Sequence, residues 1–120
     1  MHYVSTRDAS LRYTAAHAIE QGLSRDGGLF LPEKFPALPD LDSLRKLNYR
    51  QRAAAIMGLF LEDFTAEELE LFASKAYGGD KFDCSEVAPV VSLHHKTHVL
   101  ELWHGPTCAF KDMALQLLPH

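Results

Sequence analysis

Two amphipathic segments joined at a capping sequence constrain the fold of this chain more than any other feature. Apolar residues recur at helical spacing over residues 49–64 and again over residues 66–77. Between the two segments, Thr65 and Glu68 have the spacing of a capping box, in which each side chain bonds the backbone of the other residue. The apolar stripes consist of Ala53, Ile56, Phe60 and Phe64 in the first segment and of Leu69, Phe72, Ala73 and Ala76 in the second. We therefore predict two consecutive helices whose stripes pack against each other.

The amino-terminal region is predicted to combine a short helix with a pair of short strands. Thr14 is placed to cap a helix over Ala15–Gln21, and Gly22 stands where a left-handed residue is favoured at a helix end. Residues 3–6 favour extended backbone, as do residues 29–31, which follow an Asp-Gly-Gly turn sequence. We expect the two extended segments to pair, which brings the amino terminus beside the second of them.

The character of the sequence changes after Gly79. Residues 87–91 and residues 97–103 are rich in β-forming side chains and are separated by a polar turn. From about Ala109 to Pro119 the pattern becomes helical again. The chain is therefore predicted to be α+β, with a mainly helical first part that contains the strand pair and with the opening of an α/β unit after it.

Composition argues against several classes of protein. The formal net charge of -4 gives no electrostatic basis for binding nucleic acid. The longest apolar run, residues 53–61, is far shorter than the ~20 residues that span a bilayer, and the amino terminus lacks the apolar region of a secretory signal. Two cysteines, Cys84 and Cys108, are too few for a disulfide framework, so a cytoplasmic protein is expected. The basic residues Arg45, Lys46, Arg50 and Arg52 are interpreted as a solvated helix face.

Lys111 occupies the most distinctive position in the sequence. It lies in the first turn of the predicted last helix, where the helix dipole disfavours a cation. Helical spacing places Ala114, Leu115 and Leu118 on the same face as Lys111, and Asp112 and Gln116 on the other, polar side. An amine held against an apolar face loses hydration, which favours the neutral form that attacks a carbonyl carbon. Periodicity alone leaves an alternative open, in which the methylenes cover apolar neighbours while the nitrogen reaches water.

Three motifs resemble those of one enzyme family. Residues 104–112 are similar to the H-G-P-T-x-A-F-K-D segment of threonine synthases, which are pyridoxal-phosphate enzymes of the tryptophan-synthase β-like fold. Residues 3–7 resemble the family's opening Y-x-S-T-R, and residues 26–32 resemble its D-G-G-L-F-x-P. The motifs occur in the family's order and the residues between them match in pattern, so the resemblance covers the whole chain. Two departures, Asp8 for a frequent glycine and Trp103 for a frequent phenylalanine, do not affect the implied chemistry.

The resemblance implies a lyase of threonine biosynthesis, which converts O-phospho-L-homoserine and water into L-threonine and inorganic phosphate. It implies that Lys111 is catalytic and carries pyridoxal 5'-phosphate as a Schiff base. Residues 1–80 would be the threonine synthase N-terminal domain, and residues 81–120 the beginning of the catalytic, cofactor-binding domain of fold type II. Candidate cleft-lining residues are Ser5, Thr6, Arg7, His104 and Thr107. For the first three, hydrogen bonding within the strand pair is the favoured interpretation, and for the last two, packing of the loop is an equal alternative.

The sequence contains no glycine-rich loop that could cradle the phosphate of the cofactor, since Asp26 and the glycines after it are better explained as a turn. We therefore expect the chain to be part of a longer enzyme and to have no synthase activity alone. The expected partner is the small-molecule substrate, with no nucleic acid and no membrane, and the oligomeric state stays open. The alternative function is a free-standing helical binding or assembly module derived from the same family.

Two other site chemistries, a metal site and a thiol nucleophile, have less support in the sequence. His94 and His98 are four residues apart, but the segment is predicted to be a turn that enters a strand, and no second pair of ligands has zinc-site spacing, so no metal is expected. Cys108 lies near a helix start, which favours a thiolate nucleophile. No third residue that would orient His104 is evident, however, and an inert thiol is the favoured interpretation.

Overall fold

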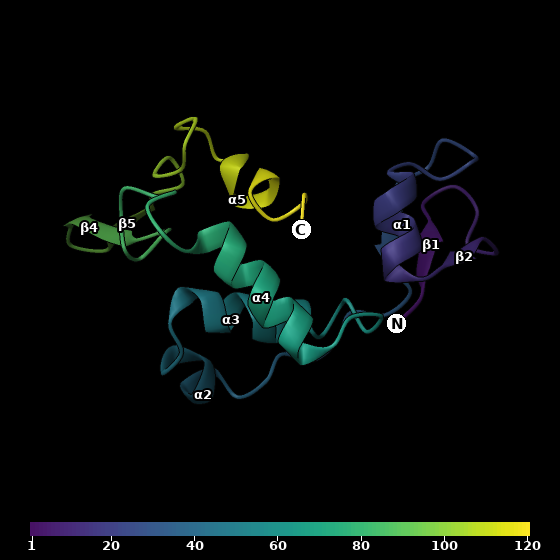
Figure 1. The fold of residues 1–120 in the computed structure, drawn as a ribbon, viewed down its shortest axis with the longest axis horizontal. Coiled ribbons are helices and arrows are strands. Elements are labelled where there is room, and N and C mark those ends of the chain that lie inside the picture. The colour runs from purple at the N-terminus through teal and green to yellow at the C-terminus, as the bar shows by residue number, and fades with distance from the viewer.

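The protein is described by a computed structural model that covers residues 1–120. It is an α+β structure of short helices and two small antiparallel sheets (Figure 1). In chain order the elements are β1 (Tyr3–Ser5), β2 (Arg12–Tyr13), α1 (Ala15–Gln21), β3 (Phe30–Pro32), α2 (Leu41–Arg45), α3 (Tyr49–Met57), α4 (Ala66–Tyr77), β4 (Val90–His94), β5 (Thr97–Leu100) and α5 (Asp112–Leu115). The α+β prediction is confirmed at this level.

The amino-terminal sheet has three strands in the order β2-β1-β3. The predicted pair is β1 with β3, in which Val4 stands opposite Leu31, and it is confirmed. The third strand, β2, was not predicted, so the expectation of only a strand pair is wrong. Because β2 has two residues, it is too short to show an alternating pattern, and its pairing with β1 is a tertiary contact.

Helix α1 has the predicted bounds and caps. The Thr14 side chain accepts a hydrogen bond of 3.3 Å from the His17 backbone N–H, and Gly22 follows with a φ of 74°. Beyond α1 the chain passes from β3 through an irregular connection to α2. These caps are local interactions within one turn of helix, which is why the sequence pattern located them correctly.

The best-packed part of the structure is the pair α3 and α4. Ala54 of α3 is buried against Leu69 and Ala73 of α4, and the rings of Phe64 and Phe72 meet edge to face at 5.8 Å. The predicted packing of the two helical segments on each other is confirmed. The first stripe is only partly correct, because Ala53 and Phe64 belong to this core but Ile56 and Phe60 do not. The capping box before α4 is confirmed as well, because the Thr65 side chain accepts from the Glu68 N–H at 3.2 Å and the Glu68 carboxylate accepts from the Thr65 N–H at 2.8 Å.

Helix α3 ends at Met57 and not at Phe64 as predicted. Gly58 is its C-cap, and the following N–H groups make tight turns, such as the 2.9 Å bond from Phe60 N–H to the Met57 carbonyl. The Phe60 carbonyl is thereby free to accept a hydrogen bond of 3.1 Å from the Tyr3 hydroxyl. Phe64 packs against Phe72 of α4 although it lies outside any helix, so the helical spacing of the phenylalanines does not reflect continuation of α3.

A short helix, α2, precedes α3 and was not predicted. Of the basic run, Arg45, Lys46 and Arg50 are exposed, as expected for a solvated face. Arg52 is different, because its guanidinium donates to the carbonyls of Leu44 at 3.1 Å and Leu47 at 2.8 Å. Its interpretation as a solvated residue is wrong, because its guanidinium holds the Leu44 carbonyl in the last turn of α2 and the Leu47 carbonyl just before α3.

The carboxyl-terminal strands form an antiparallel hairpin in which Val91 stands opposite Val99. Strand β4 begins three residues after the predicted start at Val87, because Val87 has a φ of 63° that interrupts extended backbone. Strand β5 ends at Leu100 and not at Trp103. Almost every residue of the hairpin is exposed, so its apolar side chains are not covered by other parts of this chain.

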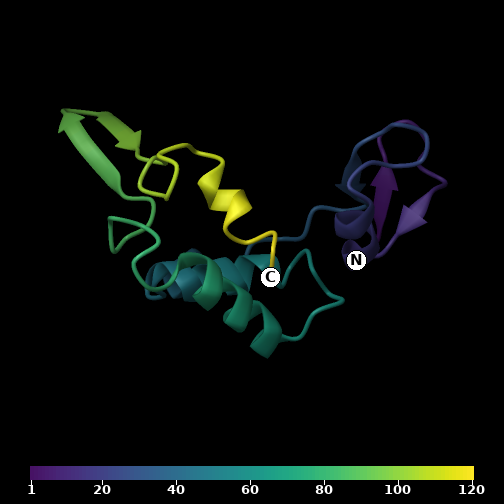
Figure 2. The ribbon, with the colours of Figure 1, turned by 45° about the horizontal axis from the view of Figure 1, so that its top comes forward.

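The elements are spread over an open structure. Figures 1 and 2 show the amino-terminal sheet and α1 at one side, α2 to α4 in the middle, and the hairpin at the other side. The radius of gyration is 16.2 Å, whereas a compact domain of this length would have roughly 14 Å, and 15 of 120 residues are buried. None of the helices is both long and apolar enough to cross a membrane. The predicted domain boundary at residue 80 stays a prediction.

Tyr77 joins the end of α4 to α5. Its hydroxyl donates a hydrogen bond of 2.7 Å to the Met113 carbonyl, and burial, with a smaller effect of Tyr49, raises the pKa of Tyr77 to about 12. We expect Tyr77→Phe to lower the free energy of unfolding by about 1 kcal/mol, the net contribution of a typical hydrogen bond, when measured by urea denaturation.

The matched control for this prediction is Tyr49→Phe. The Tyr49 ring meets the Tyr77 ring at 5.1 Å, but its hydroxyl makes no hydrogen bond within the protein, so this variant should be close to neutral. Equal losses of stability in the two variants would show that the Tyr77 hydrogen bond does not hold α5.

Candidate functional site

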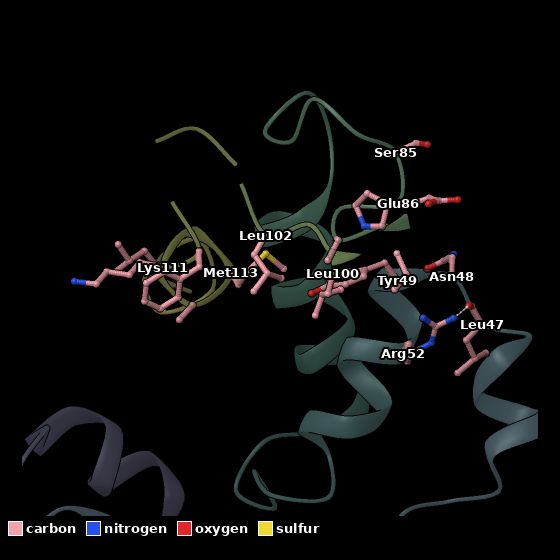
Figure 3. A pocket seen from close by; sticks show the side chains of 16 residues that line it. Leu47, Asn48, Tyr49, Arg52, Ser85, Glu86, Leu100, Leu102, Lys111 and Met113 are labelled. Carbon is pink, nitrogen blue, oxygen red and sulfur yellow. Dashed lines mark hydrogen bonds between the residues drawn. The ribbon is translucent and has the colours of Figure 1, made fainter. Parts of the chain in front are cut away.

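Lys111 lies at the N-cap position of α5, and its side chain is exposed. The amine makes no ion pair within the protein. It stands at the edge of a groove of about 1090 Å³ that runs between the start of α3, the hairpin and α5. Figure 3 shows the amine pointing away from Tyr49 and Arg52, which line the other end of the groove. Lys111 is therefore a free primary amine at the rim of a mainly apolar groove.

The predicted faces of the last helix are wrong. Asp112, assigned to the polar side, has an exposed fraction of 0%, whereas Leu115 is 51% exposed and Leu118 is 65% exposed. The helix is also shorter than predicted, since α5 has four residues and is flanked by turns. A helix of one turn is positioned by its strongest contacts, and here the hydrogen bonds of a buried carboxylate prevail over apolar periodicity. The expectation that the methylene chain of Lys111 points at a hydrophobic core is wrong.

The buried carboxylate of Asp112 organises the loop before the lysine. It accepts hydrogen bonds from the Thr107 N–H at 2.8 Å and from the Thr107 hydroxyl at 2.9 Å. Gly105 packs against the same side chain, and a Cβ atom at Gly105 would lie 2.5 Å from the Asp112 Cβ. Three positions of the motif at residues 104–112 are thus explained by one buried cluster, which sequence periodicity missed because it assigned Asp112 to solvent.

His104 bridges two carboxylates. Its Nδ1 lies 2.6 Å from an Asp83 oxygen and its Nε2 lies 2.7 Å from a Glu101 oxygen. The hydrogen bond to Glu101, followed by that to Asp83, raises the pKa of His104 above its ordinary value. The Trp103 ring stacks on the imidazole at 5.8 Å. His104 is accordingly held in place by partners on both sides, and it ties its loop to the segment that follows α4.

The two carboxylates that bind His104 argue against the alternative in which Cys108 is a nucleophile activated by His104. The statement that no third residue orients His104 is wrong, because Asp83 and Glu101 do so. The same contacts occupy both ring nitrogens, which leaves neither to accept a proton from the exposed thiol of Cys108. The geometry therefore supports the interpretation that Cys108 is not a nucleophile activated by His104.

The His104 bridge predicts a pH dependence of stability. The pKa of His104 is raised in the folded state, so the protonated ring stabilises the fold. This stabilisation is complete below the pKa of the unfolded state, about 6.5, and it is lost as the pH rises through the raised pKa of the folded state. Wild-type protein should lose stability over that range, and Glu101→Gln, which removes the larger cause, should show a weaker dependence. Urea denaturation across the range measures both, and parallel profiles for the two proteins would contradict the bridge.

Ser5, Thr6 and Arg7 lie in a second cluster, around the turn before β3. The Ser5 hydroxyl lies 2.8 Å from each Asp26 carboxylate oxygen, the Thr6 hydroxyl accepts from the Leu29 N–H at 2.9 Å, and the Arg7 guanidinium donates to the Asp26 carbonyl at 3.0 Å. These bonds support the interpretation that the three residues hydrogen-bond within the strand pair. Figures 1 and 2 place this cluster apart from α5, so the structure does not bring it together with Lys111. A role for these residues in the active-site cleft stays a prediction.

Asp26 has the predicted role of a turn former. It accepts from the Gly28 N–H at 2.9 Å, and this bond, followed by that from Ser5, lowers the pKa of Asp26 below its ordinary value. The Gly27 N–H donates to the Ser24 carbonyl at 2.8 Å. Because both glycine amides already have partners, the turn is not an anion-binding loop of free N–H groups.

The histidines of the hairpin are dispersed. His94 and His95 lie near its turn, with ring centroids 6.3 Å apart, and the His98 Nδ1 pairs with the Ser92 hydroxyl at 2.9 Å. No three or more His, Cys, Asp or Glu side chains are grouped so that they could hold a metal ion.

Comparison with known proteins identifies what the chain resembles. The family model described as the threonine synthase N terminus matches residues 2–77. The threonine synthase of Methylobacillus glycogenes is 36% identical over 98% of this chain and 27% of its own length, and that of Corynebacterium glutamicum is 39% identical over 98% of this chain and 26% of its own length. A crystal structure of pyridoxal-phosphate-bound threonine synthase from Brucella melitensis matches 98% of this chain and 26% of its own chain, with a TM-score of 0.91 and 40% identity. The chain thus spans about a quarter of the length of the relatives it matches.

Proposed function

The chain belongs to the threonine synthase family, matching its amino-terminal region, and we propose that the protein that contains it converts O-phospho-L-homoserine and water into L-threonine and inorganic phosphate. The proposal rests on the family match together with one observation at the site, the free amine of Lys111 beside a groove. We include pyridoxal phosphate as the cofactor, because a related solved structure is described as binding it.

The residues present fit the attachment of this cofactor but not the whole of its binding. Lys111 offers a primary amine without a carboxylate partner, which is the group that bonds an aldehyde. Bound pyridoxal phosphate would withdraw electrons from the α carbon of the substrate. The turn at Asp26 does not hold a phosphate, because the N–H groups of Gly27 and Gly28 already have partners. We propose that this part of the site comes from the three quarters of the family's length that this chain does not span.

The residues of the chain have distinct roles in the proposal. Lys111 would hold the cofactor through Nζ. Once the amine of the substrate has replaced Nζ on the aldehyde carbon, the freed Nζ would take a proton from the α carbon of the substrate. His104, between Asp83 and Glu101, holds the loop that leads to Lys111. Thr107 supports the same loop through Asp112.

The proposed reaction is tested with the full-length protein loaded with pyridoxal phosphate. Phosphate and threonine should form in equal amounts from O-phospho-L-homoserine, and L-homoserine, which lacks the phosphate leaving group, should give no threonine. Residues 1–120 alone should release no phosphate. Absence of threonine from the full-length reaction would exclude the proposed activity, and turnover by residues 1–120 would exclude the need for the remaining length.

A further inference from the structure

The carboxylate next to Lys111 has no role in the proposed chemistry and yet is the most deeply buried charged side chain of the region. Asp112 is 0% exposed, whereas the side chain of its neighbour Lys111 is exposed. A carboxylate loses its hydration on burial, so it is kept in such a place only when hydrogen bonds replace the lost water. The hydrogen bonds of Asp112 therefore indicate its role.

Both oxygens of Asp112 bind a single residue of the preceding loop. Oδ2 accepts from the Thr107 N–H at 2.8 Å, and Oδ1 accepts from the Thr107 hydroxyl at 2.9 Å. Two bonds from one residue to one carboxylate restrain both the distance and the orientation of the loop. The Asp112 N–H in turn donates to the Ala109 carbonyl at 3.0 Å, which closes the turn that contains Lys111.

Gly105 completes this restraint by steric exclusion. A Cβ atom at this position would lie 2.6 Å from Asp112 Oδ2 and 2.8 Å from Asp112 Cγ, which are distances that real Cβ atoms do not adopt. The loop backbone therefore rests directly on the carboxylate. The Lys111 carbonyl also accepts bonds from the N–H groups of Ala114 at 3.0 Å and Leu115 at 2.8 Å, so the backbone is fixed on both sides of the lysine.

We propose that Asp112 is a positioning residue for Lys111: through Thr107 and Gly105 it fixes the backbone from which the reactive amine extends. This inference rests on the proposed function, because it assumes that Lys111 bonds the cofactor. The long side chain of a lysine has many rotamers, and a fixed backbone limits the volume that its amine samples. A bond to a separately held aldehyde forms faster when the amine is confined near it, and a misplacement of about 1 Å can reduce the rate about 100-fold.

Two matched pairs of variants test the proposal in the full-length protein. Asp112→Ala removes both hydrogen bonds, whereas Asp112→Asn can keep both, since its amide oxygen accepts from the Thr107 N–H and its NH₂ group donates to the hydroxyl oxygen. Thr107→Val removes the hydroxyl and Thr107→Ser keeps it. Thr107 is exposed, so the second pair tests the idea even if Asp112→Ala does not fold.

The main readout is the rate at which apoprotein mixed with pyridoxal phosphate forms a covalent adduct at Lys111. The adduct is trapped with borohydride and located by peptide mass mapping, and the measured rate is divided by the fraction of protein that is folded. We expect Asp112→Ala and Thr107→Val to slow this rate by about 10- to 100-fold, and Asp112→Asn and Thr107→Ser to stay near the wild-type rate. Hydrogen exchange of the amides of residues 105–112 should be faster in the first two variants only.

The outcomes separate the two claims. Wild-type rates in folded Asp112→Ala and Thr107→Val would overturn the positioning role, whatever their melting temperatures, because a merely structural side chain changes stability and not the rate per folded molecule. A wild-type protein that forms no adduct at Lys111 would instead overturn the proposed function on which the inference rests.

Discussion

Lys111→Ala is expected to lower the rate of threonine formation by about a thousandfold or more, which is the scale for removing a group that acts both as covalent nucleophile and as base. The variant should also lose the covalent adduct with pyridoxal phosphate. Lys111→Arg should be as inactive as Lys111→Ala, because a guanidinium keeps the positive charge but does not become a neutral amine at ordinary pH. The comparison separates the need for a nucleophilic amine from the need for a cation.

Three measurements on the full-length protein check this prediction: threonine formation, the absorbance of bound cofactor, and the borohydride-trapped adduct. The matched control is Lys96→Ala, since Lys96 lies in the turn of the exposed hairpin, outside the groove that Lys111 borders. The control should keep both activity and adduct. An adduct that persists in Lys111→Ala at the wild-type rate would place the reactive amine elsewhere. Because α5 has one turn and Lys111 is exposed, neither substitution should reduce stability much.

Gly28→Ala is expected to lower the free energy of unfolding by about 3 kcal/mol, at the upper end of the usual range for overpacking a filled site. A Cβ atom at Gly28 would lie 2.1 Å from the Ser5 hydroxyl oxygen and 3.0 Å from an Asp26 carboxylate oxygen. Ser5 is buried at 3% exposure and bonded to Asp26, so it has little room to move. The substitution must displace either the hydroxyl or the turn that places β3 beside β1.

Urea denaturation of the full-length protein measures this effect, with two further variants. Gly58→Ala is the control, because its Cβ would meet nothing closer than 3.5 Å and it lies at a helix end, so its stability should not fall. The double variant Ser5→Ala and Gly28→Ala removes the closest contact and should lose less than the sum of the two single losses. Strict additivity would show that the clash with Ser5 is not the cause of the instability.

The hydrogen-bonded clusters around Asp26 and around Asp112 give a structural reason for several residues of the three motifs. Two of the sequence motifs, residues 3–7 and residues 26–32, form one hydrogen-bonded unit in which Gly28 leaves space for Ser5. The third motif, residues 104–112, is folded around Asp112. In both units a glycine lies against a buried polar side chain, so several residues of the motifs have a structural role that requires their identity.

Features that depend on neighbours within one helical turn were predictable from the sequence alone. The caps at Thr14 and Thr65 and the bounds of α1 and α4 follow from hydrogen bonds over three or four residues, which a sequence displays directly. The strand pair β1–β3 was also predictable, because the Asp-Gly-Gly turn indicates where the chain reverses before β3. Lys111 was singled out by the resemblance of the motif around it and not by its periodicity, and its reactivity stays a prediction.

The tertiary structure alone decided the remaining features. The end of α3 at Met57, the strand β2 and the carbonyl contacts of Arg52 all depend on groups that are brought together by folding. The burial of Asp112 beside an exposed Lys111 is the clearest case, because apolar spacing indicated the opposite arrangement. Periodicity ranks side chains by their average affinity for water, whereas a carboxylate that finds two donors on Thr107 is stable without water. Whether such donors are present depends on the path of the whole loop, and that path is a property of the folded chain.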